Sequence, residues 1–186
     1  SKSDLHSAWA RLFISSLISA GVRDFIISPG SRSTPLTLAV AAAVQAKAAR
    51  AHVIVDERAA AFFALGQARA SRMPSVLICT SGTAGAHYLP AVIEASQSHV
   101  PMIVITADRP WEDYDAAAAQ TIDQVKLYGA HVRHYAELGL PDANPTALRA
   151  VVRIAAQAVL TARSPHPGPV HINARFRKDR KSTRLN

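Results

Sequence analysis

Glu57 is the first residue whose type and position could do chemistry. It follows the apolar stretch 53–55, which predicts a strand, and it opens a run of small apolar residues that predicts a helix at about 57–71. A carboxylate in the first helical turn stabilises the helix dipole, and Asp56 beside it is a good helix cap. A carboxylate at the end of a strand is also placed to act as an acid or base. From the pattern alone, the helix-start role is the more economical interpretation.

A second group of reactive residues follows the short apolar strand predicted at 25–27. The proline and glycine at 29–30 break that strand, and Ser33 or Thr34 can cap the helix that comes next. Free N–H groups at a helix start attract anions, and Arg32 stands beside them. The loop lacks the Gly-Lys-Ser/Thr ending of a Walker loop. The segment is therefore either an anion site or an ordinary capped turn.

The elements that must position these residues alternate between strand and helix. Continuous apolar runs such as 75–80 are typical of strands that are buried on both faces. Such alternation favours an α/β fold with a doubly wound, mainly parallel sheet flanked by helices. We predict strands at 25–27, 53–55, 75–80, 101–106 and 169–172, with a further short strand within 131–138. We predict helices at 3–20, 34–44, 57–71, from the 81–85 loop to about 95, and at 146–162, and a loop with a short helix at 111–128.

Polar residues fall at the carboxyl ends of four of these predicted strands. In doubly wound sheets, ligands bind in the crevice beyond those ends. The convergence of four such groups at one edge is stronger evidence for a binding site than any single residue. The groups are Ser31 with Arg32, Glu57, Ser81 with Thr83, and Asp108 with Arg109.

Composition and charge narrow the class of protein. The 186 residues are 49% hydrophobic and 18% charged, which indicates a folded chain of one domain. Residues 175–186 supply five of the eight net positive charges, and the diffuse remainder disfavours a nucleic-acid partner. The one cysteine, Cys79, lies in an apolar run, and no apolar run approaches the roughly 18 residues of a membrane span. We therefore predict a cytoplasmic protein without a membrane span.

Five short motifs occur in order along the chain. They are Pro29-Gly-Ser-Arg-Ser-Thr-Pro-Leu36, Asp56-Glu-Arg58, Thr80-Ser-Gly-Thr-Ala84, Thr106-Ala-Asp-Arg-Pro110 and Gln120-Thr-Ile-Asp-Gln124. With them, residues 5–177 resemble the amino-terminal, pyrimidine-binding domain of SEPHCHC synthases, which are thiamine diphosphate-dependent enzymes of menaquinone biosynthesis. The resemblance implies a transferase that decarboxylates 2-oxoglutarate and adds the succinyl-semialdehyde unit to isochorismate. It also implies a homodimer or higher homo-oligomer, with Mg²⁺ and the diphosphate held by a second domain that we expect to be absent from this chain.

The resemblance also implies a role for individual residues. Glu57 matches the glutamate that activates the cofactor: its carboxyl beside N1′ of the aminopyrimidine favours the imino tautomer, which removes the thiazolium C2 proton. Two arginines suit substrates that carry several carboxylates. For Arg109 a structural ion pair with Asp108 is the alternative, and for Gln120 a solvated loop amide. The implied cofactor-binding residues are Glu57, Pro29, Thr80, Ser81, Gly82 and Thr83, the substrate-binding residues are Ser31, Arg32, Arg109 and Gln120, and no metal ligand is expected.

The end of the chain and two other functions stay open. We expect residues 1–177 to form the pyrimidine-binding domain, inactive by itself, and residues 178–186 to be a non-native basic tail, with a native flexible tail as the alternative. Another thiamine diphosphate enzyme, such as an acetohydroxyacid synthase-like decarboxylase, would need Glu57 but not both arginines and Gln120. A non-catalytic basic binding module would need none of them.

Overall fold

Six parallel strands form one sheet in the order β2-β1-β3-β4-β6-β5. The computed structural model describes residues 2–116 and 119–177, so the tail predicted at 178–186 lies outside the described residues. The doubly wound α/β sheet predicted from the alternation of elements is confirmed. The strands are β1 (Asp24–Ile27), β2 (Arg50–Val53), β3 (Ser75–Cys79), β4 (Met102–Asp108), β5 (His134–Leu138) and β6 (Pro169–Arg175).

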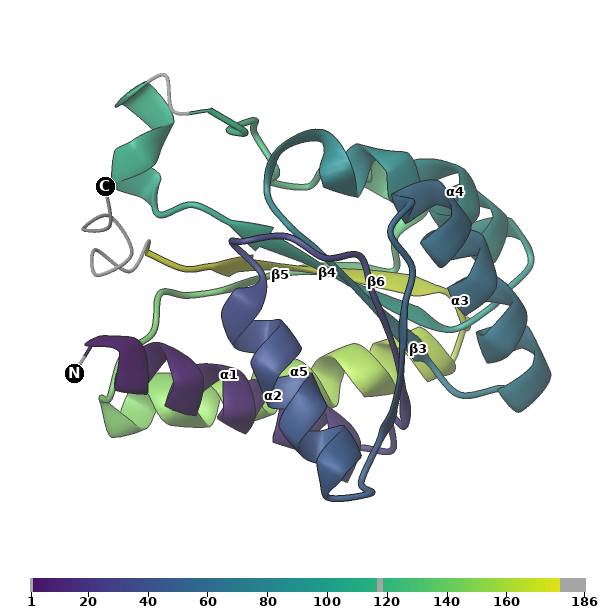
Figure 1. Cartoon of the computed structure of the whole chain (residues 1–186). Coiled ribbons are helices and arrows are strands. Elements are labelled where there is room, and N and C mark those ends of the chain that lie inside the picture. Colours follow the sequence, from purple (N-terminus) through teal and green to yellow (C-terminus); the bar gives the residue numbers. More distant parts are fainter. Residues whose placement is uncertain (1, 117–118, 178–186) are drawn as a thin grey trace.

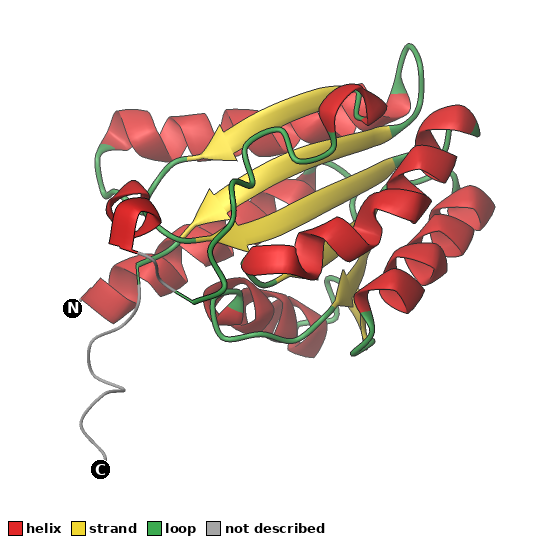
Figure 2. Ribbon diagram, turned by 90° about the horizontal axis from the view of Figure 1, so that it is seen from above, coloured by secondary structure: helices red, strands yellow, loops and turns green. Residues whose placement is uncertain are grey.

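Helices cover both faces of this sheet. The first, second and fifth α-helices pack on one face, and the third and fourth pack on the other (Figure 1). Seen from above, the arrowheads of the central strands point the same way between these two layers (Figure 2). The α-helices are α1 (Lys2–Ser19), α2 (Thr34–Gln45), α3 (Glu57–Ser71), α4 (Leu89–Gln97) and α5 (Pro145–Arg163), and the 3₁₀ helices are η1 (Gly82–Tyr88), η2 (Trp111–Ala116) and η3 (Gly129–His131).

The second strand lies earlier than the sequence pattern predicts. The apolar run suggests a strand at 53–55, whereas β2 covers Arg50–Val53 at the edge of the sheet. Its register is set by β1, with Asp24 opposite Arg50 and Ile27 opposite Val53. Val53 and Val55 are 65% and 79% exposed, so these apolar residues do not enter the core. The prediction was wrong because it assumed that apolar residues beside a strand must be buried.

Two local predictions about helix starts were also wrong. The helix expected to run to about residue 95 is divided into η1 and α4, because Pro90 has no N–H with which to continue an α-helical ladder from the preceding turn. The hydroxyl of Ser33 does not cap α2. It donates instead to the carbonyl of Gly30 at 3.0 Å, and the hydroxyl of Thr34 donates to the carbonyl of Ser31.

Strands β4 and β6 continue beyond the predicted ends at 106 and 172. They pair in register as far as Asp108 opposite Arg175, and both strands are buried along their whole length. Along β6 the side chains alternate: Val170, Ile172 and Ala174 join the core beneath α1 and α5, so the residues between them face the other side. The sheet face that carries these intervening residues is apolar near the amino ends of the strands. It becomes polar near their carboxyl ends.

His171 is a fully buried titratable group of this polar face. Its Nε2 lies 2.8 Å from the hydroxyl of Thr106, which itself donates to Asn173 Oδ1, so His171 Nε2 carries the proton and donates. Its Nδ1 has no partner among the described residues. Burial lowers the pKa of His171 to about 3, which keeps the ring neutral at physiological pH.

We expect His171 to make the fold sensitive to mild acid. Between pH ~6.5 and pH ~3 the unfolded chain binds a proton that the folded chain excludes, so the free energy of unfolding falls by up to about 1.4 kcal/mol for each pH unit lost. Urea unfolding at pH 7 and pH 5 measures this dependence. His171→Gln should have a shallower pH dependence than the parent chain. Equal pH dependence of the two proteins would contradict a neutral buried histidine.

Candidate functional site

Two loops leave neighbouring strands toward opposite faces of the sheet. The loop after β1 leads to α2, and the loop after β3 leads through η1 to α4. The loops touch closely: a Cβ built on Gly30 would stand 2.3 Å from Cβ of Thr80, so a side chain at Gly30 would collide. In doubly wound sheets, a crevice opens beyond the strand ends at such a switch point and binds ligands.

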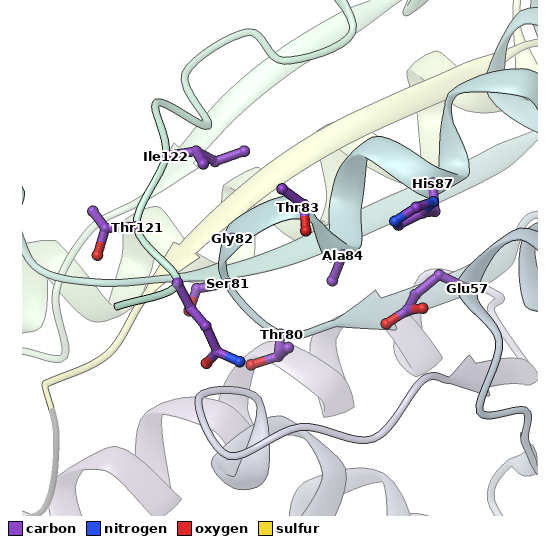
Figure 3. A pocket seen from close by; sticks show the side chains of 10 residues that line it. Glu57, Thr80, Ser81, Gly82, Thr83, Ala84, His87, Thr121 and Ile122 are labelled. Atoms are coloured by element: carbon purple, nitrogen blue, oxygen red, sulfur yellow. The ribbon is translucent and has the colours of Figure 1, made fainter. Parts of the chain in front are cut away.

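A cleft of about 490 Å³ lies at this place. Figure 3 shows Glu57 and His87 at one end of it and Thr121 and Ile122 at the other. Three separate segments supply its wall: the start of α3, the turn after β3, and the loop that precedes η3. The lining residues are Glu57, Thr80, Ser81, Gly82, Thr83, Ala84, His87, Gln120, Thr121 and Ile122.

Glu57 lines the cleft without serving as the cap of its helix. Asp56 caps α3, because its Oδ1 accepts the N–H of Ala59 at 2.8 Å. Glu57 is half-buried and makes no hydrogen bond or ion pair with the residues that the structure describes. Burial, and then the nearby charge of Glu57, raise the pKa of the Cys79 thiol at the end of β3. The carboxylate of Glu57 therefore lies at one end of the cleft, near Cys79 (Figure 3).

The turn after β3 forms the middle of the wall in a conformation that needs glycine. Gly82 has φ +85°, and a Cβ built there would lie 3.2 Å from backbone atoms of Gln120. Gln120 is itself in the left-handed region, with φ +57°. The loop that contains Gln120 thus lies directly against the backbone of Gly82, where a side chain would crowd it.

The two arginines of the predicted site lie beside the cleft, not in its lining. Arg32 is buried, and its guanidinium donates to the carbonyl of Phe176 at 2.9 Å. Arg109 donates from its guanidinium to the carbonyl of Ala119 at 2.5 Å, and its buried Nε has no partner among the described residues. Burial, and then the like charge of Arg109, lower the pKa of Arg32. The two cations therefore lie near each other, and an anion would stabilise both.

Asp108 does not form the ion pair with Arg109 that was the alternative to a substrate-binding role. Its Oδ1 accepts the backbone N–H of Arg109 at 2.7 Å, whereas its Oδ2 pairs with the guanidinium of Arg175 at 3.0 Å. Arg175 also pairs with Glu137 and lies over the ring of Trp111, 3.6 Å from its centroid. The carboxylates of Asp108 and Glu137 are thus both paired with Arg175. The guanidinium of Arg109 has no carboxylate partner within residues 2–116 and 119–177.

The structure brings together part of the predicted site and separates the rest. The predicted residues that line the cleft are Glu57, Thr80, Ser81, Gly82, Thr83 and Gln120. Pro29 and Ser31 are exposed on the loop before α2 and, with both arginines, lie outside the lining. The backbone N–H of Arg32 nevertheless donates to the hydroxyl of Thr80 at 3.3 Å, so that loop is joined directly to the cleft wall.

Sequence reasoning missed several residues of the cleft. Ala84, Thr121 and Ile122 line it, and each lies inside or next to a motif that carried the family resemblance. His87 also lines it, although no role was predicted for it. Gln124, which is fully buried behind the wall, was quoted as the last letter of a motif and given no function. Motif membership was the available signal for all of these residues except His87, which lies outside the five motifs.

Comparison with known proteins agrees with this geometry. The family described as "Thiamine pyrophosphate enzyme, N-terminal TPP binding domain" matches residues 8–127. The chain belongs to this family. Curated relatives named 2-succinyl-5-enolpyruvyl-6-hydroxy-3-cyclohexene-1-carboxylate synthase, which is SEPHCHC synthase, are 70% identical in Sorangium cellulosum, 50% in Dechloromonas aromatica and 49% in Haloarcula marismortui. The resemblance to SEPHCHC synthases predicted from the motifs is confirmed.

The similarity extends over nearly all of this chain but only part of each relative. It covers 95%, 94% and 94% of the chain in these three comparisons. It covers 28%, 32% and 29% of the relatives. The chain thus spans about a third of the length of the curated relatives that it matches.

The cleft suits the aminopyrimidine part of thiamine diphosphate. A flat, polar ring needs a close approach to backbone and several hydrogen-bond partners, and Gly82 and Ala84 leave that space. The buried hydroxyls of Ser81 and Thr121 have no partner among the described residues, so they are available to a ligand. The free carboxylate of Glu57 completes the set. These residues therefore fit the cofactor that the family name implies.

Two features are absent from the residues that the structure describes. They contain no group of three or more His, Cys, Asp or Glu side chains that could hold a metal ion. None of their helices combines the length and the apolar character needed to cross a membrane.

Gly82→Ala should destabilise the chain by about 1–2 kcal/mol, because an alanine at φ +85° is strained and its Cβ presses on the backbone of Gln120. Gly66→Ala is the matched control. Gly66 lies in α3 with open space around it, so that change should stabilise the chain by about 0.5–1 kcal/mol. Urea unfolding compares the two variants. A Gly82→Ala protein as stable as the parent would contradict the described turn.

Proposed function

We propose that this chain is the pyrimidine-binding domain, over residues 1–177, of a SEPHCHC synthase. The parent enzyme would be a transferase that decarboxylates 2-oxoglutarate and joins the succinyl-semialdehyde unit to isochorismate in menaquinone biosynthesis. The observation that carries the proposal is the free, half-buried carboxylate of Glu57 in a cleft walled by small residues. The names of the curated relatives support the same reaction.

Glu57 would act on the cofactor through a proton. When bound, thiamine diphosphate supplies the thiazolium carbon at which a 2-oxo acid loses CO₂. Glu57 would hold a proton at N1′ of the aminopyrimidine, and Thr80, Ser81, Gly82 and Thr83 would contact the ring. The absence of a competing partner for Glu57 among the described residues supports this role, because a carboxylate already in an ion pair would share its proton poorly.

Arg32 and Arg109 would bind carboxylates of the substrates, with Ser31 and Gln120 supplying neutral hydrogen bonds. The two guanidiniums lie near each other, and neither has a carboxylate partner among the described residues. Such a pair is stabilised when a dicarboxylate enters. Pro29 would keep the loop before α2 in place at the edge of the cofactor cleft.

The remaining parts of the site would come from outside this chain. The diphosphate and Mg²⁺ would be held by another domain of the parent enzyme, because a transferase of this kind needs both halves of the cofactor site. We propose a cytoplasmic homodimer or higher homo-oligomer. Exposed apolar side chains on and beside α3 and β2 support this assembly: Val53, Val55, Phe62 and Phe63.

A chimera tests the activity. In it, this chain replaces the matching 176-residue segment of the Sorangium cellulosum relative, which is 70% identical. We expect the chimera to consume 2-oxoglutarate with isochorismate, thiamine diphosphate and Mg²⁺, and the 186-residue chain alone to give no product. Glu57→Gln should reduce kcat by about 10²–10⁴-fold, because the glutamine cannot transfer the proton. A fully active Glu57→Gln chimera would overturn the proposal.

The same chimera separates the synthase from a related decarboxylase. Arg32→Ala should raise KM for 2-oxoglutarate by about tenfold or more, because a charge-assisted hydrogen bond is lost. An exposed arginine within α1, Arg11→Ala, is the control and should leave KM unchanged, because it does not line the cleft. If Arg32→Ala leaves KM for 2-oxoglutarate unchanged while Glu57→Gln is inactive, another thiamine diphosphate-dependent decarboxylase is the better assignment.

Assembly is tested on the chain itself by sedimentation at increasing concentration. The parent chain should form dimers, and Val55→Lys with Phe62→Lys should shift the equilibrium to monomers, because each places a charge in an apolar contact. Leu160→Lys is the control, since the exposure of Leu160 lies between those of Phe62 and Val55 but the residue is on α5 at the other face. Purely monomeric sedimentation of the parent chain would count against the apolar face as the interface.

A further inference from the structure

We propose that Gln124 is a positioning residue that holds the cofactor-facing turn and the substrate-facing residues in one fixed arrangement. The inference rests on the proposed function, because it concerns the same cleft. Gln124 is 1% exposed and does not line the cleft. It would therefore act through its neighbours, without touching either ligand.

All the polar atoms of the Gln124 side chain are engaged. Its Oε1 accepts the N–H of Gly82 at 2.9 Å, on the cleft side. Its Nε2 donates to the carbonyl of Ala107 at 3.2 Å and to Oδ1 of Asn173 at 3.0 Å, on the sheet side. One side chain thus joins the turn after β3 to the ends of β4 and β6, three segments that are far apart in the sequence.

The direction of this amide is fixed by charges deeper in the structure. Nδ2 of Asn173 donates to Asp108 Oδ2 at 2.8 Å and to Glu137 Oε1 at 3.1 Å. Ionised carboxylates only accept, so the NH₂ group of Asn173 must point toward them and its oxygen toward Gln124. The NH₂ group of Gln124 must then point toward Asn173, which leaves its oxygen for the N–H of Gly82. A reversed amide would place oxygen against oxygen at two contacts.

Both functional sides of the cleft are attached to this chain of hydrogen bonds. Gly82 forms the cofactor wall, and Gln120 lies against it on the same loop as Gln124, four residues away. Asp108, at the other end of this series of hydrogen bonds, accepts the backbone N–H of Arg109 at 2.7 Å. A displacement of Gln124 would therefore move the cofactor wall relative to Gln120 and Arg109. Catalysis that depends on the alignment of two bound molecules is sensitive to such shifts.

Amide exchange in the 186-residue chain tests the contact directly. In Gln124→Met the N–H of Gly82 loses its acceptor, so its exchange should speed up by about tenfold or more while the amides of β3 and β4 stay protected. Gln97→Met, an exposed glutamine at the end of α4, is the matched control and should change neither. Unchanged exchange at Gly82, or equal acceleration throughout the sheet, would overturn the proposal.

Gln124→Glu is a near-isosteric second variant that keeps the test available where the methionine variant fails to fold. It retains an acceptor for Gly82 but cannot donate to Ala107 or Asn173, so oxygen–oxygen repulsion should displace it. We expect faster exchange at Gly82 in this variant too. Full protection of Gly82 in Gln124→Glu would overturn the claim that the sheet-side bonds hold the amide in place.

Kinetics in the chimera test the positioning role. At saturating cofactor and substrates, Gln124→Met and Gln124→Glu should reduce kcat by about tenfold or more, whereas Gln97→Met should leave it unchanged. Faster exchange at Gly82 with unchanged kcat would overturn positioning and leave the proposed function standing. An active Glu57→Gln chimera would overturn the proposed function, and the Gly82 exchange would still decide whether Gln124 holds the turn.

Discussion

The carboxyl end of the sheet depends on the hydrogen bonds of one buried side chain, Asn173. Its Oδ1 accepts from Thr106 and Gln124, and its Nδ2 donates to Asp108 and Glu137. Away from water, each unmade bond of this kind would cost about 1–3 kcal/mol. Because Asn173 is fully buried, the strands and the loop that supply its partners must keep their positions together. The polar end of the sheet is therefore a single connected unit.

This connected group of residues also determines which arginine at the site pairs with the local carboxylates. Burial acts to lower the pKa of Arg175, but Glu137, Tyr114 and Asp108 outweigh it and raise that pKa. Asp108 and Glu137 are paired with Arg175, whose guanidinium stacks on the ring of Trp111. Among the described residues, the guanidinium of Arg109 is left with the carbonyl of Ala119 as its partner. A buried arginine that pairs with the local acids thus leaves the neighbouring Arg109 without a carboxylate partner among the described residues.

The alternation of strands and helices, the parallel sheet flanked by helices and the edge at which the cleft lies could be predicted because they follow from local patterns. Continuous apolar runs mark the buried strands, and ligands bind at their carboxyl ends in doubly wound sheets. The edge strand β2 was misplaced because its neighbouring valines are exposed, a case that hydrophobicity alone does not distinguish. Gln124 and the carboxyl end of β6 were missed for another reason: their partners lie about 17 to 66 residues away along the chain. The alternation of apolar and polar residues in 170–175 is visible in the sequence. The role of the polar residues becomes apparent only when β4 and β5 lie beside them.

Glu57 illustrates what the structure adds at a position whose role the sequence leaves open. A first-turn carboxylate and a working acid occupy the same position, so composition cannot separate them. The capping bond belongs to Asp56, and Glu57 instead faces the cleft without a partner among the described residues. The apolar side chains of Val55 and Phe62 stand exposed on either side of it in the sequence. A second surface that covered them would also exclude water from Glu57, and in a drier site a shared proton interacts more strongly with its acceptor. Assembly and acid chemistry would then depend on the same face of the domain.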